Sequence, residues 1–126
     1  MNLKRILYVE DEPDIQVVAK LALEMVGGYQ VMICSGGQEA LDKVGGFAPD
    51  LILLDVMMPG MDGPTTLQNL RAGSATAAIP VIFLTAKVQP AEVKQYQALG
   101  ALNVIAKPFD PMTLAAQVQG IWERKS

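Results

Sequence analysis

Residues 51–54 are Leu-Ile-Leu-Leu, and the acidic residue Asp55 follows them directly. A strand of this kind is apolar on both faces, which is the pattern of a central strand in a parallel sheet covered by helices on both sides. A strand of an antiparallel sheet with one face in water would instead alternate apolar and polar residues. This one segment therefore restricts the chain to layered folds in which helices pack on both faces of a sheet.

Four more short segments of strand character alternate with segments of helical periodicity. The predicted strands are residues 5–9, 29–34, 51–54, 80–84 and 103–106. The predicted helices are residues 13–26, which Gly27-Gly28 ends, and 38–44, which Gly45-Gly46 ends. A third helix follows the loop of residues 57–63 and ends at about Ala72, a fourth covers about 90–99, and Asp110 caps the last one. This alternation predicts a doubly wound α/β fold with a five-stranded parallel sheet. Since the sequence shows no repeat or linker, we expect one domain over residues 1–126.

The composition limits which chemistry is available. The 126 residues carry a net charge of −3, include the single cysteine Cys34, and contain no histidine. Serine–histidine and cysteine–histidine catalytic pairs are therefore excluded, and so is the commonest zinc ligand. No basic run marks a nucleic-acid surface, and no apolar stretch reaches the roughly 18 residues of a membrane span. We expect a cytoplasmic chain that contacts neither nucleic acid nor membrane directly.

Polar residues stand where the predicted strands end. They are Glu10 and Asp11 after the first strand, Asp55 after the third, Thr85 after the fourth and Lys107 after the fifth. Each alone could cap a helix or face water. In an open α/β sheet, however, ligands bind outside the carboxyl ends of the strands, near the point where the strand order reverses. Three carboxylates, a hydroxyl and an ammonium at one edge therefore favour a functional site.

The chemistry of this set favours phosphoryl transfer with a hard metal ion. Three crowded carboxylates repel one another, and a divalent cation relieves that repulsion. Oxygen donors without histidine or cysteine favour Mg²⁺, with Mn²⁺ possible, over zinc. Asp11 and Asp55 would then be direct ligands, and Glu10 would act through water. An aspartate is also a competent nucleophile towards phosphorus, while Lys107 and Thr85 would stabilise charge on the transferred group.

Four motifs carry a resemblance that covers essentially the whole chain. They are Val9-Glu10-Asp11-Glu12, the segment 53–63, Leu84-Thr85-Ala86 and Ala106-Lys107-Pro108-Phe109. Together, and in this order, they resemble the receiver domains of two-component response regulators, the chemotaxis-regulator-like family. The resemblance implies a flavodoxin-like fold with strand order 2-1-3-4-5. It also implies transfer of a phosphoryl group to Asp55 from the phosphohistidine of a sensor kinase or phosphotransfer protein.

The same resemblance implies details of the site. Mg²⁺ would be held by Asp11, Asp55 and the backbone carbonyl of Met57, and Glu10 would lie in the outer sphere. The peptide bond of Lys107-Pro108 would be cis. Mg²⁺-dependent gain and loss of its own phosphoryl group would be the only reactions of such a chain, so we do not expect an enzyme with a separate substrate.

A switch of conformation is also implied, and one residue departs from the family pattern. Phosphorylation would draw the hydroxyl of Thr85 inward and change the surface of the fourth helix, fifth strand and fifth helix, where a downstream protein would bind. The family usually has an aromatic residue three positions before the lysine, but this chain has Val104 there. We therefore expect phosphorylation of Asp55 with a different or weaker response of the output surface.

Three alternatives share parts of the pattern. A phosphatase of the haloacid dehalogenase type would need a second aspartate at the position of Met57, and a flavin-binding flavodoxin would need a phosphate loop where residues 10–13 are Glu-Asp-Glu-Pro. A degenerate receiver that acts as a phosphorylation-independent interaction module would usually lack one of the five site residues, and all five are present. With no output domain in the sequence, we expect a stand-alone regulator.

Overall fold

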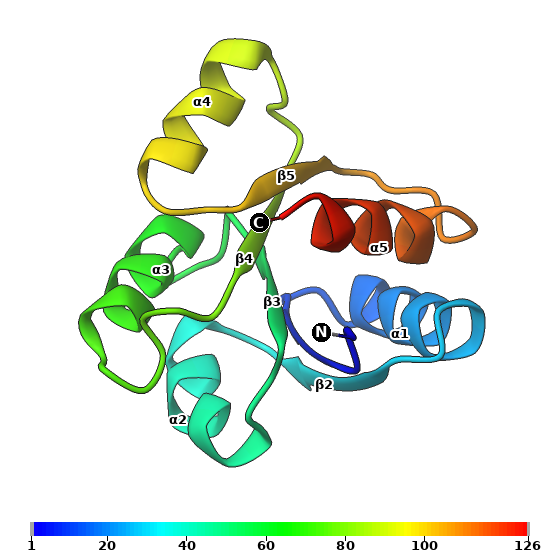
Figure 1. Ribbon diagram of the computed structural model, residues 1–126, viewed down its shortest axis with the longest axis horizontal. Helices are drawn as coiled ribbons and strands as arrows, with labels where there is room; N and C mark the ends of the chain where they lie inside the picture. The colour runs from blue at the N-terminus through cyan, green and yellow to red at the C-terminus, as the bar shows by residue number, and fades with distance from the viewer. Residues whose placement is uncertain (1, 126) are drawn as a thin grey trace.

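The computed structural model describes residues 2–125, and a five-stranded parallel sheet forms its centre (Figure 1). The strands are β1 (Arg5–Val9), β2 (Gln30–Cys34), β3 (Leu51–Asp55), β4 (Val81–Thr85) and β5 (Asn103–Ala106). They lie in the order β2-β1-β3-β4-β5, and each neighbouring pair is parallel. The doubly wound fold predicted from the sequence and the strand order implied by the resemblance are both confirmed.

Five α-helices and one π-helical turn are found within residues 2–125. They are α1 (Pro13–Leu21), the π-helical turn η1 (Ala22–Val26), α2 (Gly37–Phe47), α3 (Gly63–Ala72), α4 (Pro90–Ala98) and α5 (Leu114–Arg124). Figure 1 shows α1 and α5 on one side of the sheet and α2, α3 and α4 on the other. None of these helices has the length and apolar character needed to cross a membrane.

The central strand β3 is buried along its whole length, as its sequence predicts. Leu51 and Leu53 belong to the core layer that includes buried residues of α1 and α5, whereas Ile52 and Leu54 belong to the layer of α2 and α3. Burying a leucine or isoleucine side chain in this way stabilises a fold by about 1.5–3 kcal/mol. The strand that carries Asp55 at its end is therefore held firmly from both faces.

The end of α2 differs from the sequence prediction. The helix continues through Gly45-Gly46 to Phe47 instead of ending at Val44. Phe47 is buried, and the guanidinium of Arg5 both donates to the Phe47 carbonyl and stacks 4.5 Å from the centre of its ring. Packing and capping from another part of the chain thus outweigh the weak helix propensity of two glycines.

The start of α5 also differs from the prediction. The residue before its first turn is Thr113, and the helix begins at Leu114, four residues after Asp110. The carboxylate of Asp110 accepts a hydrogen bond from the backbone N–H of Met112 at 2.9 Å, and its carbonyl accepts from the N–H groups of Thr113 and Leu114. Asp110 therefore orders the turn between β5 and α5 and does not cap the helix.

Candidate functional site

The five residues singled out in the sequence lie at the carboxyl ends of four neighbouring strands. Glu10 and Asp11 follow β1, Asp55 ends β3, Thr85 ends β4 and Lys107 follows β5. The chain passes from β1 to β2 on one side and to β3 on the other, so the strand order reverses beside β1. The acidic residues therefore gather at the switch point where open α/β sheets bind ligands.

A lysine connects two buried carboxylates at this edge. The Nζ atom of Lys107 lies 2.9 Å from Oε1 of Glu10 and 3.2 Å from Oδ2 of Asp55. Glu10 is fully buried, and Asp55 is 4% exposed. The peptide bond from Lys107 to Pro108 is cis, as the resemblance implies. The ammonium of Lys107, which follows β5, thus lies between the acidic residues at the ends of β1 and β3.

Burial and charge perturb the titration of this pair. Burial raises the pKa of Glu10, and the nearby charge of Asp55 adds to that effect, although the hydrogen bond from Lys107 opposes it. Burial alone would lower the pKa of Lys107, but the hydrogen bond to Glu10 and the charge of Asp55 raise it above its ordinary value. Lys107 therefore stays protonated at neutral pH.

The three carboxylates form a cluster that fits a hard cation. Glu10, Asp11 and Asp55 each offer one oxygen, and these oxygens all lie within 4.8 Å of one another. A divalent cation among them would relieve the mutual repulsion of the carboxylates, so the cluster is a candidate site for one ion. The single ammonium of Lys107 cannot neutralise three carboxylates, which leaves a negative edge made only of oxygen donors.

The start of α3, at Gly63, lies in close contact with the backbone of Asp55. The N–H of Gly63 donates to the carbonyl of Val56 at 2.9 Å. A Cβ atom at Gly63 would lie 2.6 Å from the carbonyl oxygen of Asp55 and 2.8 Å from the Cα atom of Val56. The carboxylate of Asp62 caps α3 by accepting from the N–H of Thr65 at 2.8 Å. Only glycine lets the start of α3 approach Asp55 so closely.

Comparison with known proteins identifies the family. The family model of the response regulator receiver domain matches residues 6–119. The chain belongs to this family. Its receiver fold also matches that of the chemotaxis response regulator CheY4 of Vibrio cholerae, with a TM-score of 0.86 and 31% identity over 95% of this chain and 99% of that one.

Similar receiver domains occur in larger proteins. The chain is 38% identical to the phosphate regulon transcriptional regulatory protein PhoB of Pseudomonas aeruginosa, over 96% of this chain and 52% of that protein. It is 39% identical to the alkaline phosphatase synthesis transcriptional regulatory protein PhoP of Bacillus subtilis, over 96% of this chain and 49% of that protein. A receiver domain of a signal transduction histidine kinase from Syntrophus aciditrophicus has a TM-score of 0.80 and 35% identity, with 98% of this chain and 95% of that one covered. The chain spans about half the length of the curated relatives it matches.

Two further positions of this receiver domain lie at strand ends, Thr85 at the end of β4 and Met57 two residues after β3. The hydroxyl oxygen of Thr85 accepts a hydrogen bond from the backbone N–H of Lys87 at 3.1 Å. That bond uses a lone pair, so the hydroxyl proton remains available for donation. Met57 is 77% exposed, and its thioether is a soft ligand that does not suit Mg²⁺, so only its backbone carbonyl is a candidate for metal binding.

Val104 occupies the position where the receiver family usually has an aromatic residue. It lies beside Phe83 in the register of β4 and β5 and packs, partly buried, in the core layer of α2 and α3. The ring of Phe83 meets the ring of Tyr96 in α4 edge to face, with 5.2 Å between ring centres. The aromatic contact to α4 is therefore made by Phe83 of β4, two residues before Thr85, and not by a residue of β5.

The sequence reasoning missed one residue beneath the cluster, Tyr8. It is fully buried in β1, and its hydroxyl has no hydrogen-bond partner among residues 2–125. Burial raises the pKa of Tyr8, and the charges of Glu10 and Asp55 raise it further. The hydroxyl therefore stays neutral. A tyrosine among the aliphatic residues that follow Arg5 in β1 was the only sequence signal for it.

Proposed function

We propose that this receiver domain accepts a phosphoryl group on Asp55 from the phosphohistidine of a sensor kinase or phosphotransfer protein. The observation that carries the proposal is the position of Asp55, which is buried at the end of β3, 3.2 Å from Lys107 and inside a cluster of three carboxylates. A buried carboxylate beside a fixed cation is suited to attack an electrophile whose negative charge needs stabilisation.

We propose Mg²⁺ as the cofactor, because the cluster consists of oxygen donors alone. Asp11, Asp55 and the backbone carbonyl of Met57 would be direct ligands, and Glu10 would act through water. Mn²⁺ accepts the same donors. The bound ion would supply positive charge to the oxygens of the phosphoryl group.

The residues of the chain would perform the remaining work. An oxygen of Asp55 forms the new bond to phosphorus, the bond from phosphorus to the donor imidazole nitrogen breaks, and the electron pair stays with the imidazole. The Lys107 ammonium, which contacts Asp55 already, pairs with an oxygen of the transferred group. The hydroxyl of Thr85 donates its proton in a hydrogen bond to another oxygen. Later attack of water on phosphorus releases phosphate and restores the carboxylate.

The output would be a change in protein contacts. We propose that a downstream protein binds the surface formed by α4, β5 and α5, and that phosphorylation of Asp55 changes this surface. PhoB of Pseudomonas aeruginosa and PhoP of Bacillus subtilis are named as transcriptional regulatory proteins, and this chain covers about half the length of each. A single domain over residues 1–126, a cytoplasmic location and the absence of direct nucleic-acid contact stay predictions.

One alternative is favoured by a specific residue. With Val104 at the aromatic position, the chain could act as an interaction module whose partner binds regardless of phosphorylation. Incubation with acetyl phosphate and Mg²⁺ separates the two functions. We expect an acid-stable, hydroxylamine-labile adduct that the Asp55→Asn variant does not form. A wild-type chain that forms no adduct would favour the interaction module.

A further inference from the structure

Gln16 connects the acidic loop to the ends of two strands. Its side-chain amide nitrogen donates to the backbone carbonyl of Glu10 at 2.6 Å and to the hydroxyl of Ser35 at 3.2 Å. Glu10 directly follows β1, Ser35 directly follows β2, and Gln16 lies in the first turn of α1. One neutral amide thus joins three elements at the edge of the sheet that carries Asp55.

The carbonyl of Glu10 needs a donor from outside the sheet. The ladder of β1 ends with Val9, which pairs with Cys34 on one side and Leu54 on the other. The N–H of Glu10 still reaches the carbonyl of Cys34 at 2.9 Å, but β2 ends there. A buried carbonyl left without a donor destabilises a fold. Gln16 supplies that donor from α1.

The same bond restrains the backbone from which the neighbouring acidic side chain projects. The carbonyl of Glu10 and the nitrogen and Cα atom of Asp11 belong to one planar peptide unit. When Gln16 holds that carbonyl, it also holds the Cα atom from which the carboxylate of Asp11 projects. The loop has two more internal bonds, from the N–H of Glu12 to the Glu10 carboxylate at 3.2 Å and from the N–H of Gln16 to the Glu12 carbonyl at 3.0 Å.

We propose that Gln16 is a positioning residue for the divalent cation, because it keeps the carboxylate of Asp11 within range of Glu10 and Asp55. This inference rests on the proposed Mg²⁺ site. Loss of the donor frees the peptide unit, so the three carboxylates separate and bind the ion less tightly. Removal of a group that orients a metal ligand weakens metal affinity about 10–100-fold. Since Gln16 acts through the backbone of its neighbour, we expect the lower end, about tenfold.

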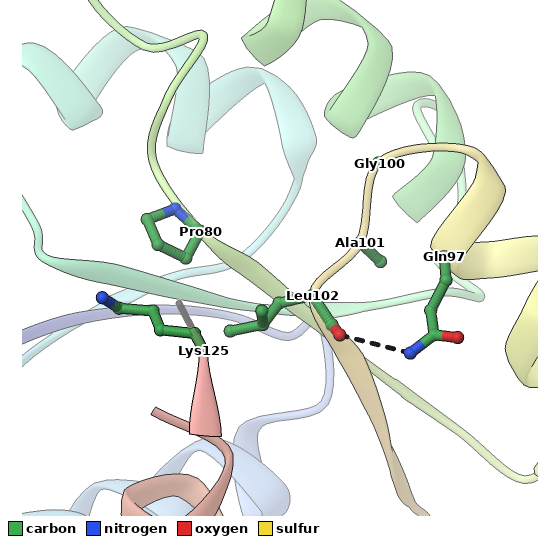
Figure 2. Close-up of a pocket in the computed structure, with 6 residues that line it drawn as sticks. All are labelled: Pro80, Gln97, Gly100, Ala101, Leu102 and Lys125. Atoms are coloured by element: carbon green, nitrogen blue, oxygen red, sulfur yellow. Dashed lines mark hydrogen bonds between the residues drawn. The ribbon is translucent and has the colours of Figure 1, made fainter. Parts of the chain in front are cut away.

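The test compares two variants that each lose one amide-to-carbonyl bond. In Gln16→Met the donor is replaced by an apolar side chain of similar length. The matched control is Gln97→Met in α4, since the amide of Gln97 donates to the carbonyl of Leu102 at 3.4 Å (Figure 2). Leu102 precedes β5, so this bond lies at the opposite edge of the sheet from Asp55. The readouts are the Kd for Mg²⁺ by isothermal titration calorimetry and the Tm of the metal-free protein.

We expect Gln16→Met to raise the Kd about tenfold and Gln97→Met to leave it unchanged. An unchanged Kd in Gln16→Met would overturn the inference, whatever happens to the Tm. A wild-type chain that binds no Mg²⁺ would overturn the proposed metal site itself, and the two failures are therefore distinguishable.

A second variant distinguishes the effect of the hydrogen-bond donor on Mg²⁺ affinity from the effect of charge at position 16. Gln16→Arg restores N–H donors of sufficient reach but adds a positive charge that repels a cation. We expect Gln16→Arg to bind Mg²⁺ more tightly than Gln16→Met, because the restored hydrogen bond returns Asp11 to its place. Weaker binding in Gln16→Arg than in Gln16→Met would show that charge governs affinity at this position and would contradict the positioning role.

Discussion

The ammonium of Lys107 donates to the carboxylate of Glu10 at 2.9 Å, although 97 residues separate the two in the chain. The bond forms because β1 and β5 both end at one edge of the sheet, with β3 and β4 between them. The same nitrogen lies 3.2 Å from Asp55. One lysine therefore contacts two buried acids in the metal-free protein, and its partners would change when a phosphoryl group arrives.

Replacing Lys107 by methionine should destabilise the metal-free fold. Breaking a buried ion pair costs about 3–5 kcal/mol, but Glu10, whose pKa is raised by burial, can take up a proton. The Lys107 side chain is also 16% exposed. We therefore expect a loss of about 2 kcal/mol at neutral pH, measured by urea denaturation. The loss should shrink as the pH falls and the Glu10 carboxylate protonates. A constant loss at every pH would contradict this account.

Replacing Glu10 by glutamine tests the buried charge. The pKa of Glu10 is raised by burial, so its protonated form favours the fold. This stabilising contribution is fully present below the ordinary glutamate range, near pH 4.3, and is lost as the pH rises through the raised pKa. The raised pKa of Lys107 affects stability only above about pH 10. We expect metal-free Glu10→Gln to be more stable than wild type at neutral pH and similar to it near pH 4, in denaturation curves across that range. Lower stability of Glu10→Gln than of wild type at neutral pH would contradict a raised pKa for Glu10.

Replacing Tyr8 by phenylalanine should stabilise the protein. The variant removes a buried hydroxyl that has no partner among the residues described, and such a group costs about 1–3 kcal/mol. The matched control is Tyr29→Phe, because the hydroxyl of Tyr29 donates to the side chain of Gln119. Thermal unfolding should show a higher Tm for Tyr8→Phe and a lower one for Tyr29→Phe. A fall in both would show that the Tyr8 hydroxyl is satisfied in solution.

Adding a methyl group at Gly63 should disturb the end of β3. The Cβ atom would meet the backbone of Asp55 at 2.6 Å, and overpacking of this kind costs about 1–3 kcal/mol. The control is Gly46→Ala in α2, where an added Cβ meets nothing within 4 Å. That variant should gain about 0.5–1 kcal/mol from better helix propensity. Equal changes in the free energy of unfolding for Gly63→Ala and Gly46→Ala would argue against the close approach at Gly63.

The output surface of this chain should respond less than that of relatives with an aromatic residue in β5. Val104 has no ring to turn inward, and the aromatic contact to α4 comes from Phe83 and Tyr96. We expect small amide shifts in α4 and β5 when a phosphoryl mimic is added, and larger ones in Val104→Tyr. Shifts in the wild type as large as those in aromatic-bearing relatives would refute the expectation.

Much of the architecture follows from local sequence patterns. The apolar runs specify the strands, and the polar residues after them mark the edge where ligands bind. Contacts between segments far apart in the sequence cannot be predicted from local patterns. The helix α2 continues past two glycines to Phe47 because Arg5 caps the Phe47 carbonyl. In the sequence, Gln16 resembles an ordinary surface residue of a helix. Its bond to Glu10 could not be predicted, because it depends on how α1 packs at the end of β1.

The central claim is that Asp55 accepts a phosphoryl group in a Mg²⁺-dependent reaction. Phosphoramidate tests it most directly, because its phosphorus–nitrogen bond resembles that of phosphohistidine and no cognate partner is needed. The purified chain would be incubated with phosphoramidate, with Mg²⁺ or with a chelator, and the modified residue located by peptide mass spectrometry. We predict a Mg²⁺-dependent phosphoryl group on Asp55 and none in Asp55→Asn. An unmodified wild-type chain, or a phosphoryl group on another residue, would contradict the account.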